Sequence, residues 1–200
     1  DNGFYGPSEI VSLADDSADP VKVASDLIAQ AEHDPGKCFL LTWDRLVLER
    51  ITAEVDRQLA ERSRQDAIVN ALKHESAAVL AESEAQAIDL ANALAAEHVN
   101  LAVADPEATL QRLDHAGEVF LGDGAPVATG DYYAGPSHCL PTGTTARFTS
   151  GVSVHTFLKR TGTVAYPHGV PRQAIDDIAR LAEAEGLDAH AESVRKRADP

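Results

Sequence analysis

The chain has 200 residues, and its 17 Lys and Arg against 32 Asp and Glu give a formal charge of −15. This charge argues against binding to nucleic acid or to an anionic membrane, because either surface would repel the protein before contact. With 44% hydrophobic and 24% charged residues, the composition is that of a folded chain rather than a disordered one.

Targeting and redox features are sparse. No apolar run approaches the roughly 18 residues that span a bilayer, and the first residues lack the basic and apolar regions of a signal peptide. The two cysteines, Cys38 and Cys139, have neither metal-type spacing nor the pattern of a disulfide framework, and Cys139 is expected to be a small buried residue. The sequence therefore predicts a cytoplasmic protein.

Between Ile10 and Asp123, short apolar runs alternate with longer amphipathic ones, which is typical of βαβ units with a mostly parallel sheet. The expected strands are residues 10–14, 38–42, 77–80, 100–103 and 119–121. Amphipathic helices that could cover the sheet are expected at residues 20–31 and 85–95. Asp19 before Pro20, and Asp105 before Pro106, are typical N-caps with proline at the first helical position.

The pattern changes beyond Leu121. Residues 122–149 are rich in Gly, Pro and Thr, and such long irregular segments are often functional. The last part is expected to be helical at residues 154–160, 171–185 and 187–196. The predicted fold class is α/β: an incomplete Rossmann-like domain over residues 1–152, followed by a small helical region over 153–200. So short a helical region buries little surface alone, so we expect it to dock on the body or on another subunit.

The first candidate for chemistry is the pair Gln30 and His33, near the end of the predicted helix 20–31. Residues three apart on a helix are neighbours, and the negative end of the helix dipole would favour a cation there. The alternative is a solvated helix end, since this spacing arises readily by chance.

The second candidate is Glu97 with His98, between a predicted helix and a predicted strand. Such termini in open α/β sheets are expected to face the ligand crevice, so the pair could act in acid/base catalysis. The alternative is an exposed pair.

Two further candidates lie toward the C-terminus. In the segment 130–138, Asp131 offers an anionic oxygen and His138 a ring nitrogen, although aspartate in a loop is more often a turn residue. Glu185 and His190 lie in the helical region, where a lone histidine on an apolar face is usually a packing residue.

Seven segments occur in the order found in histidinol dehydrogenases, and together they span nearly the whole chain. They are GPSEI (6–10), ASDLIAQAEHDP (24–35), AAEHVNL (95–101), VFLGD (119–123), GDYYAGPSHCLPTG (130–143), ARFTSGVSVHTFLKRT (146–161) and LAEAEGLDAHAESVRKR (181–197). The chain therefore resembles the C-terminal half of the histidinol dehydrogenase family.

The resemblance implies a zinc-dependent enzyme that oxidises L-histidinol to L-histidine through histidinal, with NAD as hydride acceptor. It further implies a homodimer in which one zinc ligand comes from the neighbouring subunit. The implied zinc ligands are Gln30, His33, Asp131 and, across the dimer, His190. The implied acid/base residues are Glu97 and His98. The residues implied to line the substrate pocket are Ser8, Gln30, His33, His98, Asp131, Tyr132, His138, Glu185 and His190.

This ligand set is chemically reasonable. A zinc ion held by one carboxylate and three neutral ligands keeps a net charge near +1, which suits an amino alcohol bound through its hydroxyl and neutral amine. The zinc would make that hydroxyl more acidic, and His98 could then accept its proton. Glu185 is a plausible partner for the substrate's imidazole, because a buried cation needs a charged acceptor.

The chain also departs from the family pattern. The resemblance implies a protein about twice this length whose NAD-binding residues lie mainly in the half that would precede Asp1, and the sequence has no GxGxxG motif. We therefore expect the chain to begin in mid-protein and to lack a complete cofactor site, and we assign no residue to NAD. Ala96 also stands where proline is common in the family.

Two alternatives stay open. Relatives with the same zinc ligands oxidise other small polar alcohols, including sulfonated diols, although Glu185 speaks against that substrate class. The chain could also be a non-catalytic zinc-binding or dimerisation module, since the cofactor half is missing.

Overall fold

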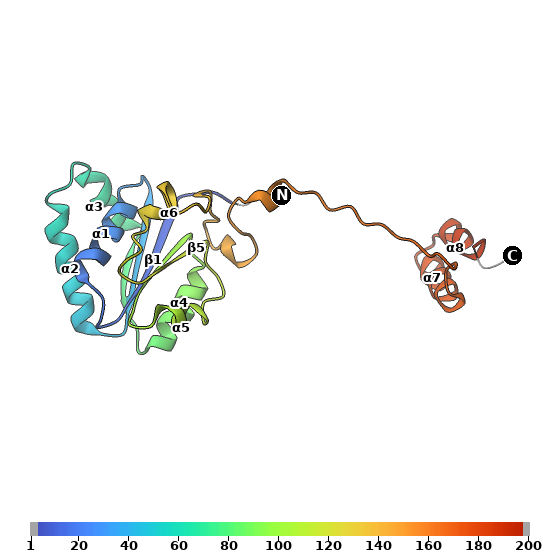
Figure 1. The fold of residues 1–200 in the computed structure, drawn as a ribbon, viewed down its shortest axis with the longest axis horizontal. Helices are drawn as coiled ribbons and strands as arrows, with labels where there is room; N and C mark the ends of the chain where they lie inside the picture. The colour runs from blue at the N-terminus through green and yellow to red at the C-terminus, as the bar shows by residue number, and fades with distance from the viewer. Residues whose placement is uncertain (1–3, 198–200) are drawn as a thin grey trace. The chain divides into compact units, whose positions relative to one another are not determined.

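The computed structural model describes residues 4–197, which form two compact units (Figure 1). The first unit ends at Leu158 and the second begins at Lys159. Each unit has its own secondary structure and its own packed residues, and they are described separately.

The first unit is a parallel α/β fold, as the sequence predicts. Its strands are β1 (Ser8–Ala14), β2 (Gly36–Thr42), β3 (Ala77–Leu80), β4 (His98–Ala102) and β5 (Glu118–Leu121). Its helices are α1 (Pro20–Ala31), α2 (Arg45–Leu59), α3 (Gln65–His74), α4 (Glu84–Leu94), α5 (Pro106–Leu110) and α6 (Ala128–Tyr132), with 3₁₀ turns at Thr145–Arg147 and Val154–Phe157.

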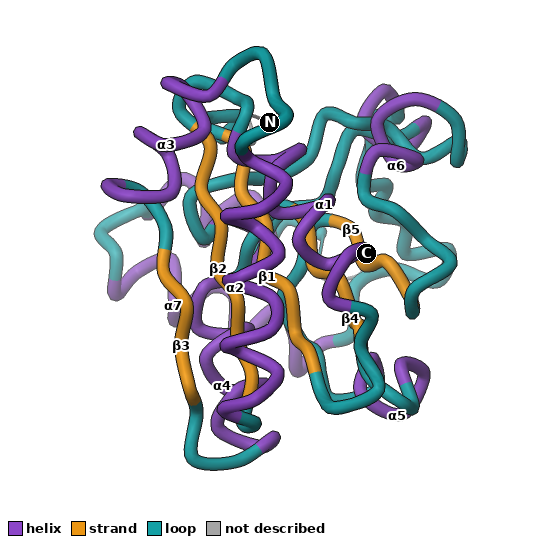
Figure 2. The backbone as a smooth tube through the Cα atoms, turned by 90° about the vertical axis from the view of Figure 1, so that its left-hand side faces the viewer, coloured by secondary structure: helices purple, strands orange, loops and turns teal. Residues whose placement is uncertain are grey.

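The sheet has the order β3-β2-β1-β4-β5, and all four strand pairs are parallel (Figure 2). The strand order reverses between β1 and β4, as it does at the switch point of Rossmann-like sheets. Parallel neighbours require a crossover connection, which the intervening helices provide.

Strand β1 shows how the two faces of the sheet are covered. Ile10 and Ala14 pack in one apolar cluster with α1, α2 and α3, whereas Val11 and Leu13 pack in another with α4. Side chains alternate between faces along a strand, so one buried run feeds both clusters. In Figure 1, α1–α3 accordingly lie on one side of the sheet and α4 on the other.

The predicted helix starts are confirmed. The carboxylate of Asp19 accepts from the backbone N–H of Val21 at 2.9 Å, and that of Asp105 accepts from Ala108 at 3.0 Å. These bonds satisfy amides that have no partner inside the helix.

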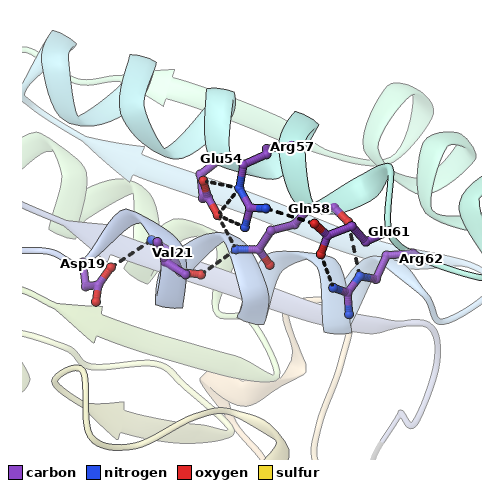
Figure 3. Close-up of polar contacts among 7 residues, drawn as sticks. All are labelled: Asp19, Val21, Glu54, Arg57, Gln58, Glu61 and Arg62. Atoms are coloured by element: carbon purple, nitrogen blue, oxygen red, sulfur yellow. Dashed lines mark hydrogen bonds and ion pairs between the residues drawn. The ribbon is translucent and has the colours of Figure 1, made fainter.

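Helix α1 is also joined to α2 by a buried side chain (Figure 3). The Gln58 amide donates to the carbonyl oxygen of Val21 and to Glu54, both at 2.9 Å. Gln58, near the end of α2, is 6% exposed, so these bonds satisfy a buried polar group. Its bond to Val21 joins α2 to the N-terminal end of α1.

Three local predictions are wrong. The segment 122–149 is not wholly irregular, because it contains the short helix α6. Residues 154–160 form only a 3₁₀ turn at Val154–Phe157; Val154 and Phe157 are 77% and 81% exposed, so no described core supports a longer helix. Cys139 is exposed rather than buried.

The second unit is a helical hairpin. Its helices are α7 (Arg172–Ala184) and α8 (Asp188–Arg195), close to the predicted ranges. Ala179, Ala182 and Ala191 pack together with Val194 beside them. Gly186 has a φ of +75° in the connecting turn, a conformation that glycine adopts without strain.

The helices are too short or too polar for a membrane span. Among residues 4–197, no helix is both long enough and apolar enough to cross a bilayer.

Candidate active site

The candidate residues of the first unit gather at the amino edge of the sheet. Ser8 begins β1, His98 begins β4 with Glu97 just before it, and Ile10 pairs with His98 across the two strands. Gln30 lies in the last turn of α1, whose C-terminal end comes to this same edge. Residues far apart in the sequence are thus brought together by the βαβ topology.

The Glu97–His98 pair does not lie at the edge of the sheet where the sequence analysis expected it. Open α/β sheets usually bind ligands at the carboxyl ends of their strands, but the structure places the pair at the amino end of β4. The physical reason is connectivity, because a residue between a helix and the following strand lies where that strand begins. The predicted strand at 100–103 also starts too late, since β4 begins at His98.

Glu97 is a buried carboxylate, 7% exposed, with two hydrogen-bond donors. Its Oε2 accepts from the hydroxyl of Ser8 at 2.5 Å and from the backbone N–H of Glu9 at 3.0 Å. Burial raises its pKa above the usual value, and these two hydrogen bonds oppose the rise. A carboxylate with a raised pKa is a stronger base than an exposed one.

His98 is 2% exposed, and burial lowers its pKa because the charged imidazolium is the form that burial disfavours. Its Nδ1 lies 3.2 Å from Oε1 of Gln30. An Nδ1–H that donates to this amide oxygen leaves the lone pair on Nε2. Nε2 is buried without a hydrogen-bond partner in the described part of the chain, and it lies 4.0 Å from Oδ1 of Asp131.

The two residues that approach the ring of His98, Gln30 and Asp131, also line a small cavity. It has a volume of about 70 Å³, and Gln30, His33, Asp131 and Tyr132 are among the residues that line it. Gln30 and His33 come from the end of α1, and the other two come from α6, which Figure 2 shows beside β5. The structure therefore brings together three of the four predicted zinc ligands and the predicted base.

These residues fit a zinc ion in donor type. Zinc binds imidazole nitrogen and carboxylate oxygen, which His33 and Asp131 supply. Gln30 can add its carbonyl oxygen, because Oε1 has a second lone pair besides the one that faces Nδ1 of His98. Its Nε2 is buried with no hydrogen-bond partner within residues 4–197, but this atom is an N–H donor and does not bind a cation.

The cavity does not form a closed metal site by itself. Within residues 4–197, no group of three or more His, Cys, Asp or Glu side chains is arranged to hold a metal ion. The ligands from the first unit include only two such side chains, His33 and Asp131, because Gln30 is an amide.

Four other predicted site residues are exposed. His138 is exposed, and its Nδ1 lies 3.4 Å from the sulfur of Cys139. Glu185 and His190 belong to the second unit and are exposed there. Tyr132 lines the cavity but is 86% exposed.

Sequence reasoning missed Glu118, which begins β5 and pairs with His98. Its Oε2 atom is buried without a partner among the described residues, and burial together with the nearby Asp131 raises its pKa. The predicted strand 119–121 leaves this residue out because a carboxylate does not extend an apolar run.

The opposite edge of the sheet does not fit a dinucleotide. The loop between β1 and α1 is Asp15-Asp16-Ser17-Ala18-Asp19, where dinucleotide-binding folds carry a glycine-rich turn. Its three carboxylates would repel a pyrophosphate, so no residue of this loop is assigned to NAD.

Comparison with known proteins decides the family. The family model described as histidinol dehydrogenase matches residues 2–198. The chain belongs to the histidinol dehydrogenase family. Among curated histidinol dehydrogenases, that of Haloarcula marismortui is 47% identical over 194 residues, which cover 96% of this chain and 46% of the relative. That of Rhodopirellula baltica is 42% identical over 198 residues, which cover 99% of this chain and 43% of the relative.

A solved histidinol dehydrogenase has the same fold. The crystal structure from Elizabethkingia anophelis superposes with a TM-score of 0.83 at 36% identity, and the match covers 96% of this chain and 44% of that one. The chain thus spans less than half the length of these histidinol dehydrogenases.

Proposed function

We propose that this chain is part of a zinc-dependent, NAD-linked enzyme that oxidises L-histidinol to L-histidine through histidinal, the last step of histidine biosynthesis. The observation that carries the proposal is the pairing of His98 with the cavity lined by Gln30, His33 and Asp131. A buried, neutral imidazole beside a candidate cation cavity is what alcohol oxidation requires of a general base.

In this proposal, Gln30, His33 and Asp131 hold the zinc together with His190 of the partner subunit. The zinc supplies Lewis acidity, which lowers the pKa of the substrate hydroxyl. The C-terminal end of α1 favours a cation here, because the helix dipole is negative at that end. Membership of the histidinol dehydrogenase family supports a homodimer in which His190 of the partner subunit completes the ligand set.

His98 then accepts the hydroxyl proton at Nε2. Gln30 contributes to this role because its carbonyl oxygen faces Nδ1 at 3.2 Å and favours the tautomer that leaves Nε2 free. His98 is buried, so its pKa is lowered and the ring is neutral before the proton arrives.

Glu97 has a separate role in the proposal. Family membership supports Glu97 as the base that activates water for the second oxidation, of the aldehyde to the acid. Its raised pKa fits this role, and Ser8 orients the carboxylate through a hydrogen bond of 2.5 Å.

The substrate pocket is proposed to include Ser8, Tyr132, His138 and Glu185. Glu185 would pair with the imidazole of the substrate, because a buried cation needs a charged acceptor. Cys38 and Cys139 are free thiols, which is consistent with the proposed cytoplasmic location.

The test is oxidation of L-histidinol by the full-length protein, followed as NADH formation before and after zinc is removed. We expect about two NADH per histidinol, loss of activity on chelation and recovery with added zinc. Preference for a sulfonated diol over histidinol would support the alternative substrate class. No oxidation of any polar alcohol by the zinc-loaded protein would overturn the proposal.

A further inference from the structure

Asp26 is a buried carboxylate on α1 that contacts two other elements of the fold. It is 9% exposed and lies four residues before Gln30. Its Oδ2 accepts from the side-chain amide of Asn100 on β4 at 3.2 Å, and its Oδ1 accepts from the backbone N–H of Val127 at 3.3 Å. Val127 directly precedes α6, so one carboxylate joins α1, β4 and α6.

Asp26, Asn100 and Val127 each lie two or four residues along the chain from a residue of the active site. Asp26 and Gln30 are neighbours on the same face of a helix. His98 is two residues before Asn100 on β4, so both side chains lie on the same face of the sheet. Asp131 lies four residues after Val127, at the end of the single turn of α6. A shift at Asp26 would therefore move all three elements relative to one another.

Asp26 also lines two cavities. It lines the cavity of about 70 Å³ at the active site and a second cavity of about 340 Å³, to which Asn100 contributes. A smaller side chain at this position would leave a void and loosen the packing beside Val127, which directly precedes α6.

A carboxylate is an unfavourable choice for a purely structural residue here. Burial raises the pKa of Asp26 to about 6, which means that the fold disfavours its charged form. The Oδ1 atom of Asn100 is also buried without a partner in the described part of the chain. A site that keeps such a group at the expense of stability fits a geometric requirement.

We propose that Asp26 is a positioning residue that holds α1, β4 and α6 in the arrangement needed to bind the catalytic zinc. It does not touch the cation; it acts through Gln30, His98 and Asp131. The inference rests on the proposed function, because it assumes that zinc binds at the amino edge of the sheet.

The test compares Asp26→Ala with Gln58→Ala in the full-length protein. Both remove a buried polar side chain tied to α1, but Gln58 acts at the opposite end of the helix (Figure 3). Zinc affinity is measured by competition with a chromophoric chelator, and stability by the thermal midpoint of the zinc-free protein. We expect Asp26→Ala to weaken zinc binding about 10- to 100-fold, as for other groups that orient metal ligands, and Gln58→Ala to lower the midpoint with little change in zinc affinity.

Two more variants separate positioning from folding. Asp26→Asn keeps the acceptor for Val127, and Asn100 can turn its unpartnered oxygen toward the new amide, so near-normal zinc affinity is expected. Asn100→Ala removes one partner without altering α1, so it decides the question if Asp26→Ala does not fold; weakened zinc binding is expected.

The outcomes are distinct. If the wild type binds no zinc, the proposed function fails. If the wild type binds zinc, and neither Asp26→Ala nor Asn100→Ala weakens binding more than Gln58→Ala does, the proposed role of Asp26 is wrong.

Discussion

At the scale of single residues, burial determines the chemistry available to His98. The ring is 2% exposed, which lowers its pKa, while Gln30 occupies Nδ1 and Nε2 stays free. Neighbouring Asp131 opposes the shift, but burial is the larger cause. The imidazole is therefore neutral at and above its ordinary titration range, as a proton acceptor must be.

This environment predicts the pH dependence of catalysis. Activity requires neutral His98, so it is lost as the pH falls through the pKa of the ring, which lies below the ordinary value of 6.5. His98→Gln should reduce kcat about 10²- to 10⁴-fold, the usual contribution of a general base, with zinc content unchanged. Kinetics from pH 5 to 9 and metal analysis test both statements. Loss of zinc in this variant would mean that His98 is a ligand instead.

Asp26 should make stability pH-dependent. Its pKa in the folded protein, about 6, lies above the ordinary 3.8, so its contribution to stability is fully present below pH 3.8 and is lost as the pH rises through 6. The neutral Asp26→Asn variant should gain stability relative to the wild type over this range, by roughly 3 kcal/mol at pH 7 compared with pH 3.8. Unfolding of both zinc-free proteins across this pH range measures the difference, and a constant difference would contradict the shift.

At the scale of secondary-structure elements, the site depends on the close approach of α6 to β5. A Cβ on Gly130 would lie 2.7 Å from Cζ of Phe120 and would meet a carboxylate oxygen of Glu118. Glycine at this position therefore lets α6 pack close to the strand, which places Asp131 near His98.

We expect Gly130→Ala to push α6 away from β5. The overpacking should lower stability by about 1–3 kcal/mol and should weaken zinc binding, because Asp131 moves with the helix. Gly124→Ala is a matched control, since a Cβ there meets nothing within 4 Å. The zinc affinity of both variants is measured by competition with a chelator. Equal zinc affinity in the two variants would contradict the prediction and show that zinc binding does not depend on the close packing of α6.

The elements also show which features the sequence predicts. Helix 20–31 matches the structure, because apolar periodicity and an Asp-Pro start mark it, and strand 77–80 matches because it is a short apolar run. Helix α6 is missed because a single turn has no periodicity. Strand β4 is predicted to begin at residue 100 because the polar His98 interrupts the apolar pattern, although it is buried against its neighbours.

The same limit applies to the site. The resemblance to the family supplied Gln30, His33 and Asp131, and their shared cavity agrees with that selection. Glu118 directly precedes the quoted segment 119–123, and Asp26 lies within the quoted segment 24–35 but is given no role there. Only the folded chain brings them beside Asp131 and Val127.

At the scale of the whole molecule, the proposed site crosses a subunit boundary. The first unit offers Gln30, His33 and Asp131, and His190 lies exposed on α8 of the second unit. A ligand donated between subunits makes metal binding and dimerisation interdependent.

Mixed dimers test this arrangement. Asp131→Ala and His190→Ala should each abolish tight zinc binding in homodimers of the full-length protein. A heterodimer of the two variants should regain about one zinc ion, since one of its two sites then has every ligand intact. Differently tagged subunits allow that heterodimer to be purified and its zinc counted. No recovery would indicate that His190 acts within its own subunit or does not bind zinc.

The most direct test of the account is an anomalous difference map, recorded at the zinc absorption edge, from crystals of the zinc-loaded full-length protein. The account predicts one strong peak per subunit, in the cavity beside His98 and within bonding distance of Gln30, His33 and Asp131. A zinc peak bound by other residues, with this cavity empty, would contradict it.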